Sequence, residues 1–220
     1  MAIIATALVS KAQDCKQFFP TEVGKKIEVT EYDKKSKETS KTVREVTDYQ
    51  TAGSNATVSF KDVYYDLPID TVVSTREYSI RCEDGVFYAD PMVYTKNEST
   101  AQYEGFETKI ETDNVTIPAN AKSGDILPDG KVVITIITPG MPITITVNLT
   151  NRKVEPNEKI TTPAGTFDCM KISYDFSMKM LLTFRGKATQ WYADGIGLIK
   201  TENYNKKGKM TNFSQVTKID

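Results

Sequence analysis

The sequence contains no histidine. Histidine is the side chain that most often moves protons near neutral pH and most often binds transition metals, so its absence excludes Ser-His-Asp and Cys-His catalysis. The three cysteines, Cys15, Cys82 and Cys169, show no C-x-x-C spacing, which excludes a zinc site. These absences argue against an enzyme, and we expect no catalytic, cofactor-binding or metal-binding residues.

The chain also lacks the glycine-rich signatures of nucleotide binding. No G-x-x-x-x-G-K-[ST] loop is present, and no helical pattern follows Gly195-Ile196-Gly197-Leu198, so this stretch is not a dinucleotide fingerprint. We expect its glycines to lie at a bulge or tight bend beside Trp191. The aspartates Asp113, Asp125 and Asp129 do not match the spacing of a calcium-binding loop.

An excess of charge of one sign is missing as well. The chain has 28 basic and 29 acidic residues and a formal net charge of -1, so no net field draws it to DNA, RNA or an anionic membrane surface. The local basic stretch 205–209 places Gly208 after two lysines, and we interpret it as a solvated hairpin tip. No apolar run approaches the ~20 residues that span a bilayer, so we expect neither a membrane-spanning segment nor a nucleic-acid partner.

The beginning of the chain predicts an exported protein. Residues 1–9 form a short apolar run, and Ser10-Lys11-Ala12 offers small residues at the alternate positions that signal peptidases accept. We interpret residues 1–12 as the remnant of a secretory leader cut before Gln13, although no basic segment precedes the run. The alternative is a short strand or helix packed on the domain. Asp14 directly before Cys15 argues against a lipid anchor, and the expected location is the periplasm or outside the cell.

An oxidising compartment of that kind allows disulfide bonds. We then expect Cys15 to pair with Cys82, which would tie the N-terminal segment to a strand and contribute roughly 4 kcal/mol through loop closure. Cys169 lies between Phe167 and Met170 in an alternating strand, and we expect it to be a buried free thiol.

From residue 25 onward, segments rich in Val, Ile, Thr, Tyr and Phe recur between turn signals, which is typical of an antiparallel all-β domain. We expect one such domain over residues 16–220. Its strands are predicted at 25–32, 41–49, 56–65, 75–81, 86–89, 109–112, 131–138 and 143–149. Glycine-containing turns are expected at 83–85, 128–130, 185–186 and 207–208 because glycine accepts the positive φ of tight turns.

The last third of the chain predicts strong curvature. Ile143, Ile145, Val147 and Leu149 alternate with polar residues and must share one face of a strand. A longer alternation over 167–184 would extend about 60 Å as one strand, well beyond the usual ~20 Å. It must therefore bend or contain a bulge, which favours a strongly curved sheet forming a half-barrel or barrel. A short helical segment near residues 91–104 is expected to cross the opening.

The same stretch carries a methionine and aromatic stripe. On a curved sheet it would face the concave side, where methionine suits an adaptable apolar groove. The alternative is plain core packing, because a half-buried sheet needs a continuous apolar face. The candidate groove residues are Met170, Phe176, Met178, Met180, Phe184 and Trp191.

Several acidic residues lie near predicted strand ends. Two carboxylates facing each other could act as a glycosidase pair, but acidic residues are also common where strands turn into water, and we interpret these as solvated turns. They are Asp66, Asp70, Glu83, Asp84 and Asp90.

Several short sequence motifs resemble those of a known family. Phe19-Pro20 with Gly24, Tyr32-Asp33, the stretch 165–169 and the stretch 191–197 with Glu202 resemble the TapB-like secreted proteins of unknown function. These are similar in architecture to the LolA/LolB-like periplasmic half-barrels. The resemblance implies a curved antiparallel sheet and an envelope location without catalytic residues, and relatives of known role carry acyl chains in an apolar hollow.

Three functional hypotheses follow. The first is an exported, non-catalytic envelope protein that binds a lipid or other apolar ligand in the concave face, without a cofactor. The second is an interaction module that contacts an envelope protein partner through its outer surface or a sheet edge. The third is a carboxylate-based glycan hydrolase, which requires two facing acidic groups with a perturbed pKa.

Overall fold

The structure is a computed structural model that describes residues 15–94 and 106–220. The expected leader remnant, residues 1–12, lies outside the described residues. Thirteen strands form one antiparallel sheet in the order β6-β8-β9-β10-β11-β12-β13-β1-β2-β3-β4-β5-β7. Their bounds are β1 Lys26–Asp33, β2 Glu38–Ala52, β3 Asn55–Asp66, β4 Thr71–Glu83, β5 Val86–Tyr88, β6 Glu107–Asp113, β7 Thr116–Pro118, β8 Gly130–Ile137, β9 Ile143–Thr162, β10 Gly165–Lys179, β11 Thr183–Ala193, β12 Gly197–Asn205 and β13 Met210–Ile219.

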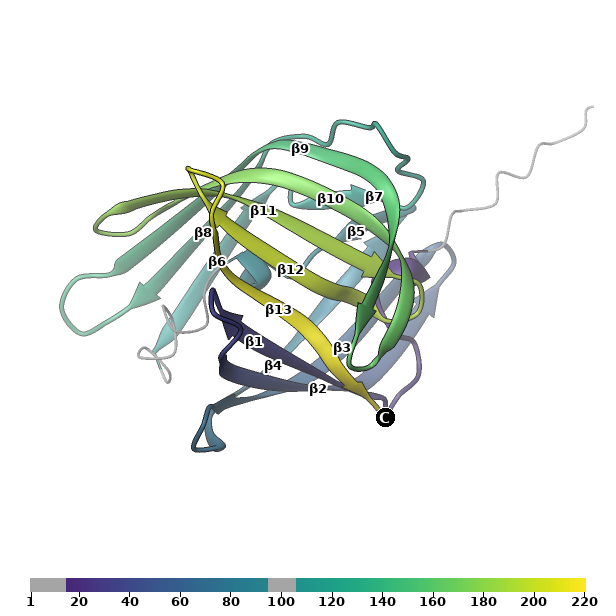
Figure 1. Ribbon diagram of the computed structural model, residues 1–220, viewed down its shortest axis with the longest axis horizontal. Coiled ribbons are helices and arrows are strands. Elements are labelled where there is room, and N and C mark those ends of the chain that lie inside the picture. Colours follow the sequence, from purple (N-terminus) through teal and green to yellow (C-terminus); the bar gives the residue numbers. More distant parts are fainter. Residues whose placement is uncertain (1–14, 95–105) are drawn as a thin grey trace, which may run out of the picture.

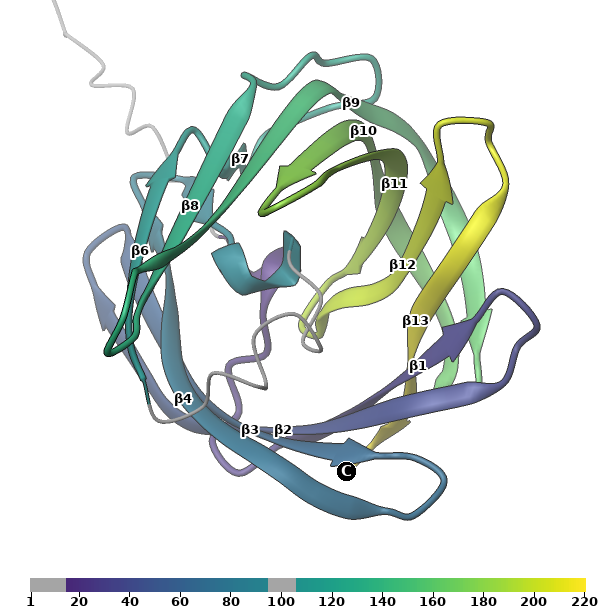
Figure 2. The same cartoon turned by 90° about the vertical axis from the view of Figure 1, so that its left-hand side faces the viewer.

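The sheet curls around a hollow, as Figure 2 shows along the axis of the curl (Figures 1 and 2). The all-β, strongly curved antiparallel fold predicted from the sequence is confirmed. A short 3-10 helix, η2 (Pro91–Tyr94), lies inside the curl (Figure 2). It lies within the range 91–104 where a short helical segment was expected, and the residues of that range after 94 lie outside the described part of the chain.

Two of the expected glycine turns form as predicted. Asp84 and Gly85 have φ values of 49° and 76°, and Gly208 has φ of 73°, conformations that favour asparagine, aspartate or glycine. The other two predictions are wrong. Gly130 begins β8 instead of closing a turn, and Gly186 lies inside β11. Glycine marks these two places for close packing, since Gly186 faces the ring of Phe176.

The long alternation over 167–184 is not one strand. It breaks at residues 180–182, where the chain turns back, and the Met180 N–H donates to the Leu182 carbonyl at 3.2 Å. The turn escaped prediction because Met180 and Leu182 continue the apolar alternation straight through it. The expected irregularity is present upstream, where the pairing of β10 with β9 shifts register between Cys169 and Lys171 and again between Ser173 and Asp175.

Apolar residues of the inner face form the main core. Val132, Ile134, Ile145, Val147 and Leu149 have no solvent-exposed area at all. Ile145, Val147 and Leu149 share one face of β9, as the alternation predicts, and Ile143 packs against the same core. A second apolar cluster surrounds the single tryptophan, and its buried members are Ile27, Ile160, Cys169, Trp191, Ala193, Ile199 and Val216.

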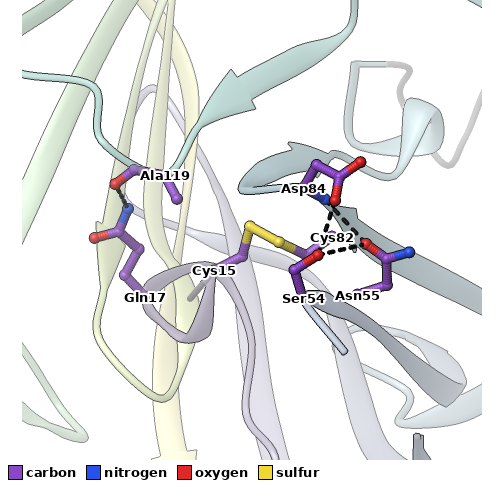
Figure 3. The surroundings of a disulfide bond; sticks show 7 residues. All are labelled: Cys15, Gln17, Ser54, Asn55, Cys82, Asp84 and Ala119. Carbon is purple, nitrogen blue, oxygen red and sulfur yellow. Dashed lines mark hydrogen bonds between the residues drawn. A yellow bond between two sulfur atoms is a disulfide. The ribbon is translucent and has the colours of Figure 1, made fainter. Parts of the chain in front are cut away.

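The N-terminal segment closes one end of the curl. Its 3-10 turn η1 (Lys16–Phe18) follows Cys15, which forms a disulfide with Cys82 of β4, and Gln17 donates to the Ala119 carbonyl at 2.8 Å (Figure 3). Phe18 stacks on Phe87 with ring centroids 4.6 Å apart. On the other side a Cβ at Gly197 would lie 2.6 Å from the Phe18 carbonyl oxygen, so only glycine lets β12 approach this closely.

Candidate ligand-binding cavity

The hollow inside the curl contains a cavity of about 550 Å³. This volume lies within the range of small-molecule sites, roughly 300–1,000 Å³. Its lining combines strands that are far apart in the sheet: β9, β10 and β11 supply one wall, β2, β3 and β4 supply the facing wall, and β12, β13 and β1 line the side between them.

The wall from β9 to β11 is apolar. Tyr174, Phe176 and Met178 occupy alternate positions of β10 and therefore point to the same side of the sheet. Ile145 and Leu149 of β9 are fully buried and back this surface. Helix η2 adds Met92, Val93 and Tyr94, and the Tyr94 ring meets Tyr174 edge-on with centroids 5.8 Å apart. The wall is thus made of aromatic rings and flexible methionines, which adapt to irregular apolar shapes.

The facing wall carries a row of charges. Arg44 of β2 lies opposite Asp62 of β3, and Asp62 lies opposite Arg76 of β4. Arg44 donates from Nε to Asp62 Oδ1 at 2.9 Å and from Nη2 to Oδ2 at 2.8 Å. Arg76 instead turns to Asp90, just before η2, and donates to both carboxylate oxygens. Each aspartate therefore accepts two hydrogen bonds from one arginine, and both carboxylates are largely shielded from solvent.

Tyrosines complete the polar wall. The Tyr78 hydroxyl donates to Asp62 Oδ2 at 3.3 Å, and the Arg76 guanidinium lies 3.9 Å from the centre of the Tyr78 ring. Burial raises the pKa of Tyr64 to about 12, so this hydroxyl stays protonated at physiological pH. Among the described residues, Arg76 Nε is a buried donor without a hydrogen-bond partner. The charged wall therefore contains one N–H donor, Arg76 Nε, whose hydrogen bond is not satisfied by the described protein atoms.

The cavity lining reaches one end of the sheet. Phe184 lies there with 53% of its surface exposed, next to Arg185. Asn205 of β12 and Thr211 of β13 line the same end. The opposite end is the one that η1 closes.

The structure brings together four of the six residues expected in the groove. Phe176, Met178, Met180 and Phe184 line the cavity. Met170 packs against the main core without reaching the lining.

Trp191 lies in the second cluster instead. Its indole N–H donates to Glu158 at 3.0 Å, with Lys171 and Lys200 each 5.4 Å from its ring centre. The pKa of Glu158 is lowered by hydrogen bonds from Lys171 and Trp191.

The charged wall was not predicted from the sequence, apart from Asp90, which was expected among acidic residues near strand ends. A signal was present: Val58, Phe60 and Asp62 alternate along β3, which places Asp62 on the core face, where the structure buries it completely. The other acidic candidates lie at or next to turns. Asp70 pairs with Lys41, Glu83 with Arg81, and Asp84 accepts from Ser54 (Figure 3).

Cys169 is a free, buried thiol, and its burial raises its pKa to about 11. No group of three or more Cys, Asp or Glu side chains in residues 15–94 and 106–220 is arranged to hold a metal ion. In the same residues no helix is both long and apolar enough to cross a membrane.

Two solved structures share this fold. One is a "putative exported protein with YmcC-like fold" from Bacteroides fragilis NCTC 9343, with a TM-score of 0.79 and 22% identity over 92% of this chain and 98% of that chain. The other is a "putative lipoprotein" from Parabacteroides distasonis ATCC 8503, with a TM-score of 0.79 and 24% identity over 94% of this chain and all of that chain. No curated protein matches the sequence. A family model described as DUF3108-like matches residues 22–216, nearly the whole chain, which therefore belongs to the DUF3108-like family.

Proposed function

We propose that this protein is an exported, non-catalytic envelope protein that holds a lipid or other apolar molecule in its central cavity. The observation that carries the proposal is the cavity of about 550 Å³ with a continuous apolar wall on β9 and β10. A site of this kind buries a hydrocarbon chain against Phe176, Met178 and Met180, and removing apolar surface from water drives such binding. The charged wall gives the polar end of the same ligand a place to be solvated.

Export is supported by two observations. A disulfide joins Cys15 and Cys82, and disulfides persist in oxidising compartments. The structural neighbours bear the words "exported protein" and "lipoprotein" in their descriptions. The resemblance to TapB-like and LolA/LolB-like proteins stays an expectation and adds no support here.

A catalytic role has less support. A glycan hydrolase needs one carboxylic acid ready to donate a proton to the leaving group. The two aspartates in the cavity lining, Asp62 and Asp90, are each engaged by an arginine through two hydrogen bonds. Both arginines stay protonated, since attraction to neighbouring groups raises each guanidinium pKa despite burial.

The alternative role, pairing of a sheet edge with a strand of another protein, is disfavoured by the two edge strands. Edge strand β6 is exposed along its whole length and carries Glu107, Lys109, Glu111 and Asp113. The other edge, β7, has three residues and ends at Pro118. Charged side chains, short length and proline are the devices that discourage a sheet from adding another strand.

Native mass spectrometry of the protein, purified without detergent from its own envelope, tests the ligand. An added mass that disappears on denaturation is expected. Met178→Asp places a charge in the apolar wall and should abolish the added mass, whereas Thr144→Asp, on an exposed position of β9, should retain it. A bare polypeptide mass for the wild type, or an added mass that Met178→Asp retains in full, would count against the proposal.

A further inference from the structure

Five hairpin turns gather at the open end of the cavity. Because the strands are antiparallel, turns lie alternately at the two ends of the sheet, and the pairing registers place the turns 34–37, 67–70, 138–142, 180–182 and 206–209 at the same end. Figure 2 looks onto this end. The cavity-lining residues Met180, Phe184, Asn205 and Thr211 lie within or beside these turns. We call the five turns the hairpin rim.

The hairpin rim is strongly basic although the whole chain is nearly neutral. The five turns contain six lysines and one acidic residue, Asp70, and the Asp33 carboxylate lies beside them, where it accepts hydrogen bonds from the Lys35 and Lys37 backbone N–H groups. The hairpin turns at the other end, 53–54, 84–85, 163–164 and 194–196, contain two aspartates and no basic residue. All six lysines are exposed, and no ion pair to them is found within the described part of the chain; they are Lys34, Lys35, Lys37, Lys206, Lys207 and Lys209.

The rim is also apolar where turns are ordinarily polar. Leu181 is 92% exposed and Leu182 is 70% exposed at the tip of the β10–β11 hairpin. Met141 is 80% exposed in the β8–β9 turn, and Ile69 is 69% exposed in the β3–β4 turn. Turn positions favour Gly, Pro, Asn, Asp and Ser, and single exposed apolar residues need no explanation. Three of these four residues lie on two adjacent hairpins, β8–β9 and β10–β11, and the fourth lies on the same end of the sheet, which indicates a binding surface.

We propose that the hairpin rim docks on the surface of an anionic lipid bilayer. Lysines attract acidic headgroups while aliphatic side chains enter the boundary of the acyl region, the combination that interfacial membrane binding requires. A lipid surface fits better than nucleic acid, because exposed Leu181, Leu182 and Met141 have no counterpart on a phosphate backbone. The inference rests on the proposed function in that the rim surrounds the mouth of the cavity, so docking would bring that mouth to the source of an apolar ligand.

Vesicle flotation tests the docking separately from cavity binding. The probes are vesicles of phosphatidylcholine alone and of phosphatidylcholine with phosphatidylglycerol. The protein should float with the second kind only, and added salt should weaken the binding. Replacing Lys206, Lys207 and Lys209 together by Gln should lower the partition coefficient about a hundred-fold, since each lysine near an anionic surface contributes about one factor of five.

A second variant tests the apolar tip. Leu181→Ser with Leu182→Ser should lower vesicle binding, whereas Ile126→Ser is the matched control, because Ile126 is 71% exposed and lies outside the rim. Met178→Asp should dock like the wild type even when its cavity is empty, so failure of the cavity ligand and failure of docking are distinguishable. Absence of flotation, equal flotation with both kinds of vesicle, or flotation that neither rim variant changes would overturn the proposal.

Discussion

Arg44 and Asp62 are joined side by side by two hydrogen bonds, Nε to Oδ1 at 2.9 Å and Nη2 to Oδ2 at 2.8 Å. The Asp62 side chain is only 1% exposed, whereas Arg44 keeps 29% of its side chain open toward the cavity. Their pairing fixes the register of β2 against β3, because a shift by one residue would move Asp62 to the other face of the sheet.

Asp62→Asn should destabilise the protein by about 3–5 kcal/mol. The amide keeps the shape of the carboxylate but leaves the Arg44 charge partly buried and uncompensated. The free energy of unfolding in urea measures the effect. Asp168→Asn is the control, because Asp168 is 84% exposed in its ion pair with Lys159 and such pairs contribute about 0–1 kcal/mol. Equal losses in the two variants would contradict the assigned role of Asp62.

The disulfide between Cys15 and Cys82 should hold the N-terminal segment against the sheet. Replacing Cys15 and Cys82 together by Ser is expected to lower the free energy of unfolding by about 4 kcal/mol, since the bond closes a loop with a sequence separation of 67 residues. Dithiothreitol should destabilise the wild type and leave the double variant unchanged, which shows that the effect comes from this bond. An unchanged unfolding midpoint for the wild type after complete reduction would refute the prediction.

The sequence predicted those parts of the fold that depend on local chemistry. Asp84-Gly85 closes a turn because its residues accept positive φ, and Ile145, Val147 and Leu149 share a buried face because strand side chains alternate. The turn at 180–182 could not be read in this way. Met180 packs against the core and Leu182 continues the apolar alternation of the strand, so no turn-forming residue marks the reversal.

The candidate site was predictable only on its apolar side. Phe176 and Met178 follow from the alternation of one strand. The charged wall depends on three strands, since Arg44, Asp62 and Arg76 become neighbours only through the registers of β2, β3 and β4. Trp191 belongs to the second apolar cluster and not to the cavity lining. The sequence around a buried residue does not tell which of two apolar clusters of a curved sheet it joins.

The contacts of Glu158 with Trp191 of the second apolar cluster should weaken at low pH. In the folded state the pKa of Glu158 lies below its ordinary value of 4.5, because hydrogen bonds from Lys171 and Trp191 favour the carboxylate. The contribution of these contacts to stability is therefore present above about pH 4.5 and lost as the pH falls through the lowered pKa. Trp191 is the single tryptophan, so its fluorescence reports the loss directly.

Glu158→Gln should make the protein less stable at neutral pH and remove part of the decline in stability on acidification. Glu107→Gln, on the exposed edge strand β6, is the control and should leave the tryptophan signal unchanged. If Glu158→Gln reproduced the acid response of the wild type in full, the hydrogen bonds to Glu158 would not be its source.

Gly186 of β11 lies between Phe176 of β10 and Tyr204 of β12. A methyl group there would overlap the Tyr204 carbonyl oxygen of β12 and come within 2.8 Å of the Phe176 ring. The overlap with the carbonyl oxygen is relieved only if the backbones of β11 and β12 move apart, which weakens their ladder hydrogen bonds. The contact with the Phe176 ring requires a separate movement of that side chain.

Gly186→Ala is therefore expected to destabilise the protein by about 1–3 kcal/mol, the usual cost of overpacking a core. Gly140→Ala is the matched control, because no atom lies within 4 Å of the added methyl and the same substitution should be neutral or slightly stabilising. Chemical unfolding measures both. Because Phe176 lines the cavity, Gly186→Ala should also change the amount of ligand retained in native mass spectra, whereas Gly140→Ala should not. A destabilised Gly186→Ala variant with unaltered retention would mean that the backbones of β11 and β12 take up the added methyl group, and that the ring of Phe176 stays where it forms the cavity wall.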